Sequence, residues 1–229
     1  MSNSGRPVHD SYQRFFQEYL TKERFFEFGV KEIIYGDLEK VRDNWNALKY
    51  RIVNGGDKVY IRGFGRNASG SQLYLDFYKY LFPKAVVEID PTNNYAPTTT
   101  IKEMTGYAKQ ESRKYTHIMN YQVSHVFGRT KNVYLFTAPW NIVYLPKLLD
   151  PLTGHESKGV WAEEFTSIFQ RQICEKFEEH IGDYNELVTA GDFTSRLDEG
   201  IQSLKDKYTI DEVEKLASAV KTDFSIIDV

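Results

Sequence analysis

The chain has 229 residues, 41% of them hydrophobic, and a formal net charge of −3, so it can bury the core of one large or two small domains. Its single cysteine, Cys174, excludes an internal disulfide and a Cys-x-x-Cys zinc site, and therefore indicates a reducing compartment. Because no run of residues is apolar enough for a membrane span or a signal peptide, we expect a cytoplasmic protein that does not bind membranes.

The first half of the chain is predicted to be mixed. Apolar residues recur at helical spacing in residues 9–28, where Asp10 or Ser11 would cap the helix. Further helices are expected at residues 38–52, 71–82 and 98–112. Short strands are expected at residues 58–64 and 84–90, between turns rich in glycine, proline and asparagine.

Two extended runs dominate the middle of the chain. The first is "YQVSHVF", the second is "VYLFTAPWNIVYLP", and the polar turn "GRTKN" separates them. The second run is broken near Ala138 and Pro139, and the loop "DPLTGHES" follows it. A long helix is expected from Val160 to Phe177, and a last one over residues 209–221, capped by Thr209 or Asp211 and followed by a loosely ordered tail. The predicted fold class is α+β, with few strands and many helices.

The order strand, loop, strand, loop, helix carries three polar residues at notable positions. His125 lies in the first strand, Asn141 heads the last part of the second run in "WNIVYLP", and Asp150 and His155 follow nine and fourteen residues later. Residues 117–165 therefore resemble the His-Asn-His (HNH), or ββα-metal, endonucleases. The resemblance implies a ββα-metal hairpin-plus-helix core embedded in a largely helical domain.

The resemblance also implies a role for each residue. His125 would be the general base, since an imidazole with an ordinary pKa near 6.5 can accept a proton from water at neutral pH. Asn141 would hold the loop between the strands. A divalent cation, Mg²⁺ or Mn²⁺, would be held by His155, at the mouth of the helix, or by Asp150, which has the usual spacing of the third ligand. The sequence departs from the family in having Ser124, a poor ligand, directly before His125.

Positive charge is concentrated in the middle of the chain. Residues 49–150 contain 14 Lys and Arg but only 7 Asp and Glu, whereas the segments on either side are acidic. Since Lys and Arg supply most of the affinity for phosphates, the middle of the chain could bind nucleic acid. Arg129 and Lys131 in the turn after His125 are the best placed for phosphate contacts, and Arg62 and Arg66 in a glycine-rich loop are further candidates. Ordinary surface turns would use the same residue types.

The expected organisation has three parts: residues 1–115 for substrate recognition, 116–182 for catalysis and 183–229 as a helical extension. Analogy with the HNH family points to a restriction or other defence-type endonuclease. DNA is the expected substrate, RNA stays open, and cutting both strands would favour a homodimer. The alternative is a catalytically silent module that binds nucleic acid or another partner and keeps the hairpin as a scaffold. A nuclease site around Glu88 and Asp90 is the weaker competitor, because no Glu-x-Lys follows.

Overall fold

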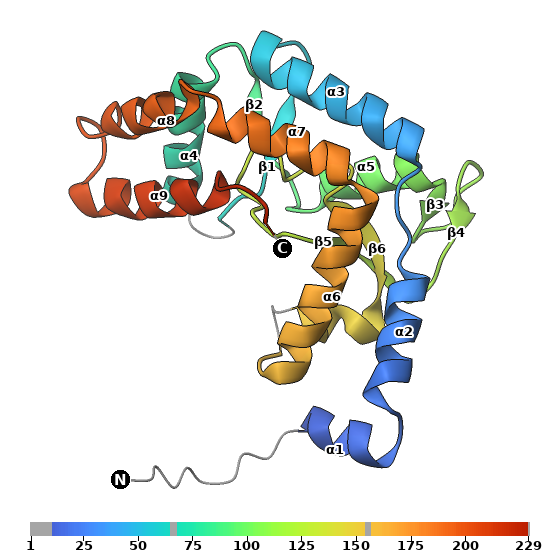
Figure 1. Cartoon of the computed structure of the whole chain (residues 1–229). Coiled ribbons are helices and arrows are strands. Elements are labelled where there is room, and N and C mark those ends of the chain that lie inside the picture. Colours follow the sequence, from blue (N-terminus) through green and yellow to red (C-terminus); the bar gives the residue numbers. More distant parts are fainter. Residues whose placement is uncertain (1–10, 65–67, 154–156, 229) are drawn as a thin grey trace, which may run out of the picture.

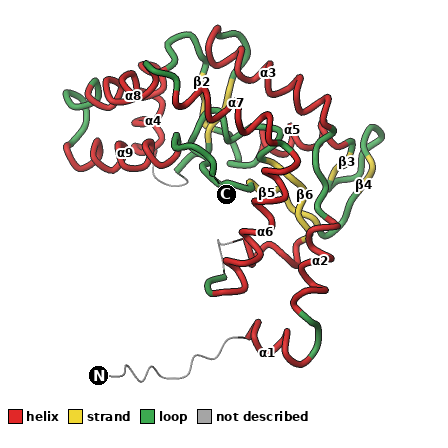
Figure 2. The backbone as a smooth tube through the Cα atoms, viewed as in Figure 1, coloured by secondary structure: helices red, strands yellow, loops and turns green. Residues whose placement is uncertain are grey.

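Short strands lie among helices that make up most of the chain (Figures 1 and 2). The computed structural model describes residues 11–64, 68–153 and 157–228. In this part of the chain the helices are α1 (Ser11–Glu18), α2 (Lys22–Glu32), α3 (Leu38–Asn54), α4 (Ala68–Leu81), α5 (Tyr95–Thr105), the 3₁₀ helix η1 (Lys147–Thr153), α6 (Val160–Lys176), α7 (Glu178–Thr189), α8 (Phe193–Gln202) and α9 (Ile210–Asp223). The strands are β1 (Val59–Ile61), β2 (Val87–Ile89), β3 (Tyr107–Ala108), β4 (Thr116–His117), β5 (Tyr121–His125) and β6 (Ile142–Pro146).

The strands form three separate pairs. β1 and β2 are parallel and are connected through α4, and β3 and β4 form a second, shorter parallel pair. β5 and β6 are antiparallel, and their register runs from Tyr121 opposite Pro146 to His125 opposite Ile142. The fold is mostly helical and contains both parallel and antiparallel strand pairs, which agrees with the predicted α+β class. None of the described helices is both long and apolar enough to cross a membrane.

The β5–β6 hairpin separates two apolar clusters. Val143 and Leu145 of β6 belong to the main core, together with Phe165 and Phe169 of α6. On the other face, Ile142 and Tyr144 pack with Ile101 of α5 in a small second cluster. This agrees with the alternation of side chains along a strand, which sends neighbouring residues to opposite faces of the hairpin.

The N-terminal prediction was wrong in one respect. The single helix expected over residues 9–28 is two helices, α1 and α2, because Thr21 has an extended backbone (φ −65°, ψ 142°) at the start of α2. The apolar spacing continues across this break, since Phe16 of α1 lies 5.4 Å from Phe25 of α2 and 5.7 Å from Trp161 of α6, measured between ring centroids. A hydrophobic pattern thus predicted the buried face but not the bend.

Three further expectations differ from the structure. The helix expected over residues 98–112 is α5, which ends at Thr105 because Gly106 has a left-handed backbone conformation (φ 75°), and β3 follows it. Of the second extended run, only Ile142–Pro146 is a strand, because residues 133–138 form successive buried turns. The C-terminal tail is held rather than loose, since the side-chain oxygen of Asn185 accepts a hydrogen bond of 2.8 Å from the backbone N–H of Ile227. The caps of α3 and α9 are Asp37 and Thr209, whose side chains accept backbone hydrogen bonds from the first turn.

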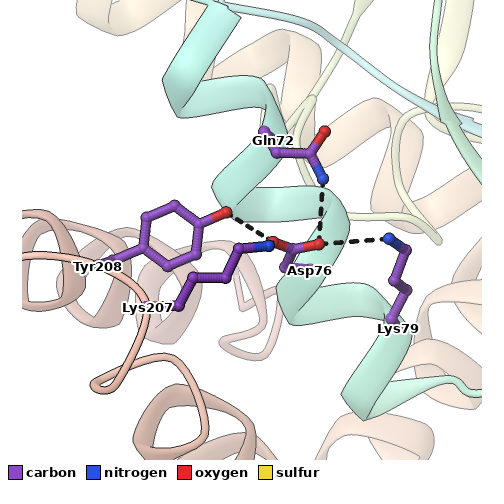
Figure 3. Close-up of polar contacts among 5 residues, drawn as sticks. All are labelled: Gln72, Asp76, Lys79, Lys207 and Tyr208. Atoms are coloured by element: carbon purple, nitrogen blue, oxygen red, sulfur yellow. Dashed lines mark hydrogen bonds and ion pairs between the residues drawn. The ribbon is translucent and has the colours of Figure 1, made fainter.

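A polar cluster joins α4 to the loop between α8 and α9 (Figure 3). The carboxylate of Asp76 accepts hydrogen bonds from Tyr208 (2.6 Å), Gln72 (3.0 Å) and Lys79 (3.3 Å), and it also pairs with Lys207. Desolvation opposes ionisation here, but these donors together hold the pKa of Asp76 well below its usual range. The cluster therefore ties a helix of the first half of the chain to the C-terminal helices.

Candidate active site

The end of β5 carries the histidine singled out from the sequence. His125 is the last residue of β5, and Asn141 directly precedes β6, so both lie where the two strands of the hairpin stop pairing. The backbone N–H of Val126 still donates to the carbonyl of Asn141 (2.9 Å), which closes the hairpin at this end. Residues 126–140 form the long loop that connects β5 to Asn141 and β6 at this end of the hairpin.

Asn141 braces this loop from within. Its side chain is fully buried; its Oδ1 accepts from the backbone N–H of Phe127 (3.0 Å), and its Nδ2 donates to the carbonyl of Leu135 (2.9 Å). One amide thus satisfies a donor on one side of the loop and an acceptor on the other, because it carries both an acceptor oxygen and a donor NH₂ group. The arrangement has the form expected for an asparagine that holds the loop between the strands.

A second buried asparagine fixes the far part of the same loop. Asn132 accepts from the backbone N–H of Tyr134 (2.8 Å) through Oδ1, and its Nδ2 donates to the carbonyl of Asp223 (2.8 Å) and to the hydroxyl of Tyr184 (3.1 Å). These contacts tie the loop to α7 and to the end of α9. The loop is long, but buried side-chain amides anchor it at two places, Asn141 at Phe127 and Leu135 and Asn132 at Asp223.

The loop in turn orients His125. Nε2 of His125 lies 2.9 Å from the carbonyl oxygen of Phe136, and the two rings stack with centroids 5.5 Å apart and an interplanar angle of 11°. A carbonyl oxygen can only accept, so Nε2 must carry the proton in this contact. In the neutral ring the lone pair is then on Nδ1, which becomes the basic nitrogen. The loop therefore selects one tautomer of His125.

Asp150 lies in η1, close to a different part of β5. It pairs with the amide nitrogen of Gln122, three residues before His125. Since side chains alternate along a strand, Gln122 and His125, which are three positions apart, point to opposite faces of β5. Helix α6 packs on the Gln122 side of the hairpin, where its Gln170 donates to the carbonyl of Val126 (3.2 Å).

The carboxylate of Asp150 is a ligand of the type that a hard cation prefers. Among the described residues no group of three or more His, Cys, Asp or Glu side chains is arranged to hold a metal ion. Asp150 supplies one carboxylate, which accepts a hydrogen bond from the amide nitrogen of Gln122, and Mg²⁺ is commonly held by one or two carboxylates together with water and substrate phosphate. His155, the other predicted ligand, lies outside the described residues.

The predicted phosphate contacts have structural partners. Arg129, in a left-handed backbone conformation (φ 51°), donates to the carbonyls of Ser225 and Ile226, and so it holds the C-terminal segment. The ammonium group of Lys131 lies 3.3 Å from the ring centroid of Phe64, and desolvation lowers its pKa. The contacts do not test whether Arg129 and Lys131 bind phosphate, so both roles stay predictions.

Arg62 comes close to the turn that carries Arg129 and Lys131. Its backbone N–H donates to the carbonyl of Thr130 (2.9 Å), while its side chain is exposed. Arg66 lies outside the described residues. The structure thus brings the backbone of Arg62 beside the turn that carries Arg129 and Lys131.

The competing site has a structural explanation. Asp90 is buried, and its carboxylate accepts from the backbone N–H groups of Thr92 (3.0 Å), Tyr95 (3.0 Å) and Ala96 (2.7 Å) at the start of α5. Glu88 pairs with Lys58 at 2.8 Å. Asp90 therefore serves the N-terminus of α5, where unpaired N–H groups require an acceptor.

Three residues around the site were not identified from the sequence. Asn132, Phe136 and Gln170 position the loop, the imidazole and the helix, respectively. The sequence carried one signal for Asn132, its place at the end of the polar turn "GRTKN". Nothing in the spacing pointed to Gln170, because its partner is a backbone carbonyl 44 positions away.

Fold and site together define a mostly helical α+β protein with a histidine at the end of an antiparallel hairpin whose loop is braced by buried asparagines. The family model described as "Uncharacterised protein PM1201" matches residues 36–229, and the chain belongs to this family. It is 38% identical over 226 residues to "Uncharacterized protein PM1201" of Pasteurella multocida (strain Pm70), with 96% of this chain and 97% of that protein covered. No solved structure matches the chain.

Proposed function

We propose that this protein is a metal-dependent endonuclease of the HNH class that hydrolyses DNA. The observation that carries the proposal is the brace at Asn141, whose buried amide fixes both sides of the loop that orients His125. Asn141 fixes the loop, and the carbonyl of Phe136 in that loop sets the tautomer of His125, an arrangement that suits a catalytic base. The order β5, β6, helix agrees with the ββα arrangement of that class.

His125 is the proposed general base. With its Nε2 proton donated to Phe136, the ring would accept a proton at Nδ1 from the water that attacks the phosphorus atom. The carbonyl of Phe136 stabilises the imidazolium that results, because its oxygen remains an acceptor for the same N–H. The ring stack on Phe136 limits rotation of the imidazole and so keeps Nδ1 in one direction.

Asp150 and His155 are the proposed cation ligands. Mg²⁺ or Mn²⁺ bound there would neutralise charge on the phosphoryl oxygens of the substrate. On the protein side, Gln122 orients the carboxylate of Asp150 through its amide N–H. Arg129, Lys131, Arg62 and Arg66 are the proposed phosphate contacts.

The biological role proposed is restriction or defence, with residues 1–115 in substrate recognition and a homodimer for cutting both strands. A cytoplasmic location follows from the same proposal, because the DNA substrate would be there. All of these rest on analogy with the HNH class.

The test is cleavage of supercoiled plasmid DNA by the purified protein with Mg²⁺ or with Mn²⁺. We expect nicked and linear products from the wild type and at least a 100-fold slower rate from His125→Ala, the usual size of a lost general base. His180→Ala is the matched control, because His180 lies in α7 on the acidic part of the chain, and it should cut at the wild-type rate. Circular dichroism would check that both variants fold.

Metal variants separate the two proposed ligands. Asp150→Asn or His155→Ala should raise the Mg²⁺ concentration needed for half-maximal cleavage, and the variant with the larger shift identifies the main ligand. Intact plasmid with every metal, or equal cutting by His125→Ala, would sink the nuclease proposal. Binding of DNA without cutting would instead favour the silent binding module.

A further inference from the structure

A cavity of about 770 Å³ lies at the other end of the hairpin from His125. It is bordered by α5, by the segment that carries β3 and β4, and by the ends of β5 and β6 where Tyr121 pairs with Pro146. Figure 1 shows these elements grouped beside the hairpin, on the side away from α6. The volume is that of a site for a small molecule or for a segment of a polymer.

Three lysines from three separate segments line the cavity. Lys102 comes from α5, Lys109 follows β3, and Lys147 follows β6. The backbone N–H of Lys147 donates to the carbonyl of Asn120 (2.8 Å). Glu111 is the acidic side chain in the same wall. Positive charge therefore exceeds negative charge in this wall.

Among the described residues, none of Lys102, Lys109 and Lys147 forms an ion pair with a carboxylate. Desolvation in the cavity and the nearby charge of Lys147 both lower the pKa of Lys109. Two ammonium groups that disfavour each other's charge are stabilised when an anion binds between them.

The rest of the wall can hydrogen-bond an anion. Ser112, His117 and Asn120 line the cavity with hydroxyl, imidazole and amide groups. Tyr115 lies between two cations, since the ammonium groups of Lys102 and Lys114 are 5.2 and 5.0 Å from its ring centroid. Such a mixture of lysines and neutral donors is typical of contacts to phosphate oxygens.

The cavity and His125 lie on the same face of the hairpin. Tyr121 lines the cavity, and Tyr121, Val123 and His125 alternate onto one side of β5. Tyr144, which also lines the cavity, belongs with Ile142, the partner of His125, to the small apolar cluster on that face. Tyr121 and His125 are four positions apart on an extended strand, a distance of about 13 Å.

We infer that this cavity binds the phosphates of the DNA backbone on one side of the cleaved bond. The inference rests on the proposed function, which it extends from the chemistry to the position of the substrate. At about 3.4 Å of helix rise per base pair, 13 Å corresponds to about four base pairs between the phosphate that reacts at His125 and the edge of the cavity at Tyr121. DNA would therefore run from the His125 end of the hairpin to the cavity across the outside of α5, which covers this face of the hairpin.

Binding measurements with an inactive protein test this without depending on cleavage. In a His125→Ala background, a fluorescent DNA duplex is titrated at several salt concentrations, with and without the added changes Lys102→Gln, Lys109→Gln and Lys147→Gln. We expect binding to weaken about 10- to 100-fold at 0.1 M salt, and the slope of log affinity against log salt to fall by about 2 to 3, one for each lost phosphate contact.

The control carries the same change in net charge elsewhere. Lys31→Gln, Lys40→Gln and Lys205→Gln alter three exposed lysines outside the cavity, and this triple variant should keep the parent slope within about 1. In the active protein, the cavity variant should raise KM for DNA while the single-turnover rate at saturating DNA stays within about threefold of wild type.

Each outcome has a definite meaning. An equal loss of affinity in both triple variants overturns the inference, because net charge alone would then explain binding. Tight binding of ATP that depends on the cavity lysines, or preference for an RNA duplex of the same sequence, would overturn the assignment to DNA. If the parent protein binds no DNA at all, the proposed function fails first, and this result is distinguishable from a cavity variant that binds normally.

Discussion

At the scale of single residues, buried amides determine the shape of the site. Asn141 and Asn132 are both fully buried, and their side chains together satisfy backbone groups of the loop at Phe127, Tyr134 and Leu135. A buried backbone group without a partner is costly, so a loop with this many turns inside the core can form only with such partners. The shape of the loop therefore depends on the two asparagines as well as on its apolar residues.

Replacing Asn141 should destabilise the fold. Asn141→Ala leaves the N–H of Phe127 and the carbonyl of Leu135 without a partner in the core, and we expect the free energy of unfolding to fall by about 2–4 kcal/mol. Urea denaturation followed by fluorescence measures this. Asn46→Ala, at an exposed position of α3, should change stability by less than about 0.5 kcal/mol. A loss at Asn141 below about 1 kcal/mol would contradict the brace.

The sequence predicted the brace but not its partners. Asn141 stood out because it follows His125 at a fixed spacing and heads a strand-like run, and the structure puts both at the end of the hairpin. Asn132 contacts Tyr184 and Asp223, which are 52 and 91 positions away. No local pattern can predict such pairs, since they arise only when the C-terminal helices pack against the loop.

Asp223 gives the folded state a pH dependence of its own. Desolvation raises its pKa from 3.8 to about 6, although Lys131 and Arg129 act in the opposite direction. Between about pH 4 and pH 6 the folded chain keeps a proton that the unfolded chain has released, so the free energy of unfolding decreases as pH rises through this window. The decrease amounts to about 3 kcal/mol at most, from about 1.4 kcal/mol for each pH unit of difference.

Asp223→Asn tests this dependence. The variant should match the wild type near pH 4 and be more stable than it at pH 7, with the difference appearing across the window from pH 4 to pH 6. Thermal unfolding at several pH values provides the measurement. Parallel stability curves for the two proteins over this range would show that Asp223 does not titrate as described.

At the scale of elements, helices far apart in the sequence are joined by a few polar contacts on apolar surfaces. α4 meets α8 at Gly200. A Cβ atom added at Gly200 would lie 3.2 Å from the ring of Phe77, so the two helices approach closely. Next to this contact, Asp76 of α4 binds Lys207 and Tyr208 (Figure 3). The pattern of apolar residues predicted α4, but it could not predict which helices α4 would meet.

Removing the charge of Asp76 should loosen the C-terminal helices. The pKa of Asp76 is lowered, so its contribution is present above its ordinary pKa of 3.8 and is lost as pH falls below that value. We expect Asp76→Asn to cost about 1–2 kcal/mol at pH 7, the usual worth of charge-assisted hydrogen bonds that are partly exposed, and to reduce the loss of stability between pH 4 and pH 2.

An exposed carboxylate of the same region serves as the control for Asp76. Asp192 is 3.9 Å from Arg196, and its side chain is 75% exposed. Asp192→Asn should therefore change stability by less than about 0.5 kcal/mol at either pH. Chemical denaturation at pH 7 and pH 3 compares the two variants. Equal effects of both changes would mean that the Asp76 cluster is no stronger than an ordinary surface pair.

At the scale of the whole molecule, the three regions expected from the sequence share one core. Trp140 of the hairpin loop lies 5.5 Å from Trp45 of α3 and 6.1 Å from Tyr184 of α7, measured between ring centroids. The main apolar cluster contains all three side chains. The boundaries near residues 116 and 182 therefore mark changes of predicted role, while the packing crosses both of them.

This shared core predicts that the hairpin region does not fold alone. Residues 116–182 expressed as a fragment would expose Trp140 and the apolar face of the hairpin loop, which Trp45 and Tyr184 cover in the whole chain. We expect the fragment to give poorly dispersed NMR spectra, and the full chain to unfold in one cooperative transition with equal calorimetric and van't Hoff enthalpies. A fragment with a well-dispersed spectrum, or separate transitions in the full chain, would mean that the hairpin, η1 and α6 form an independent unit. In that case the contacts of Trp140 would serve only to dock that unit on the surrounding helices.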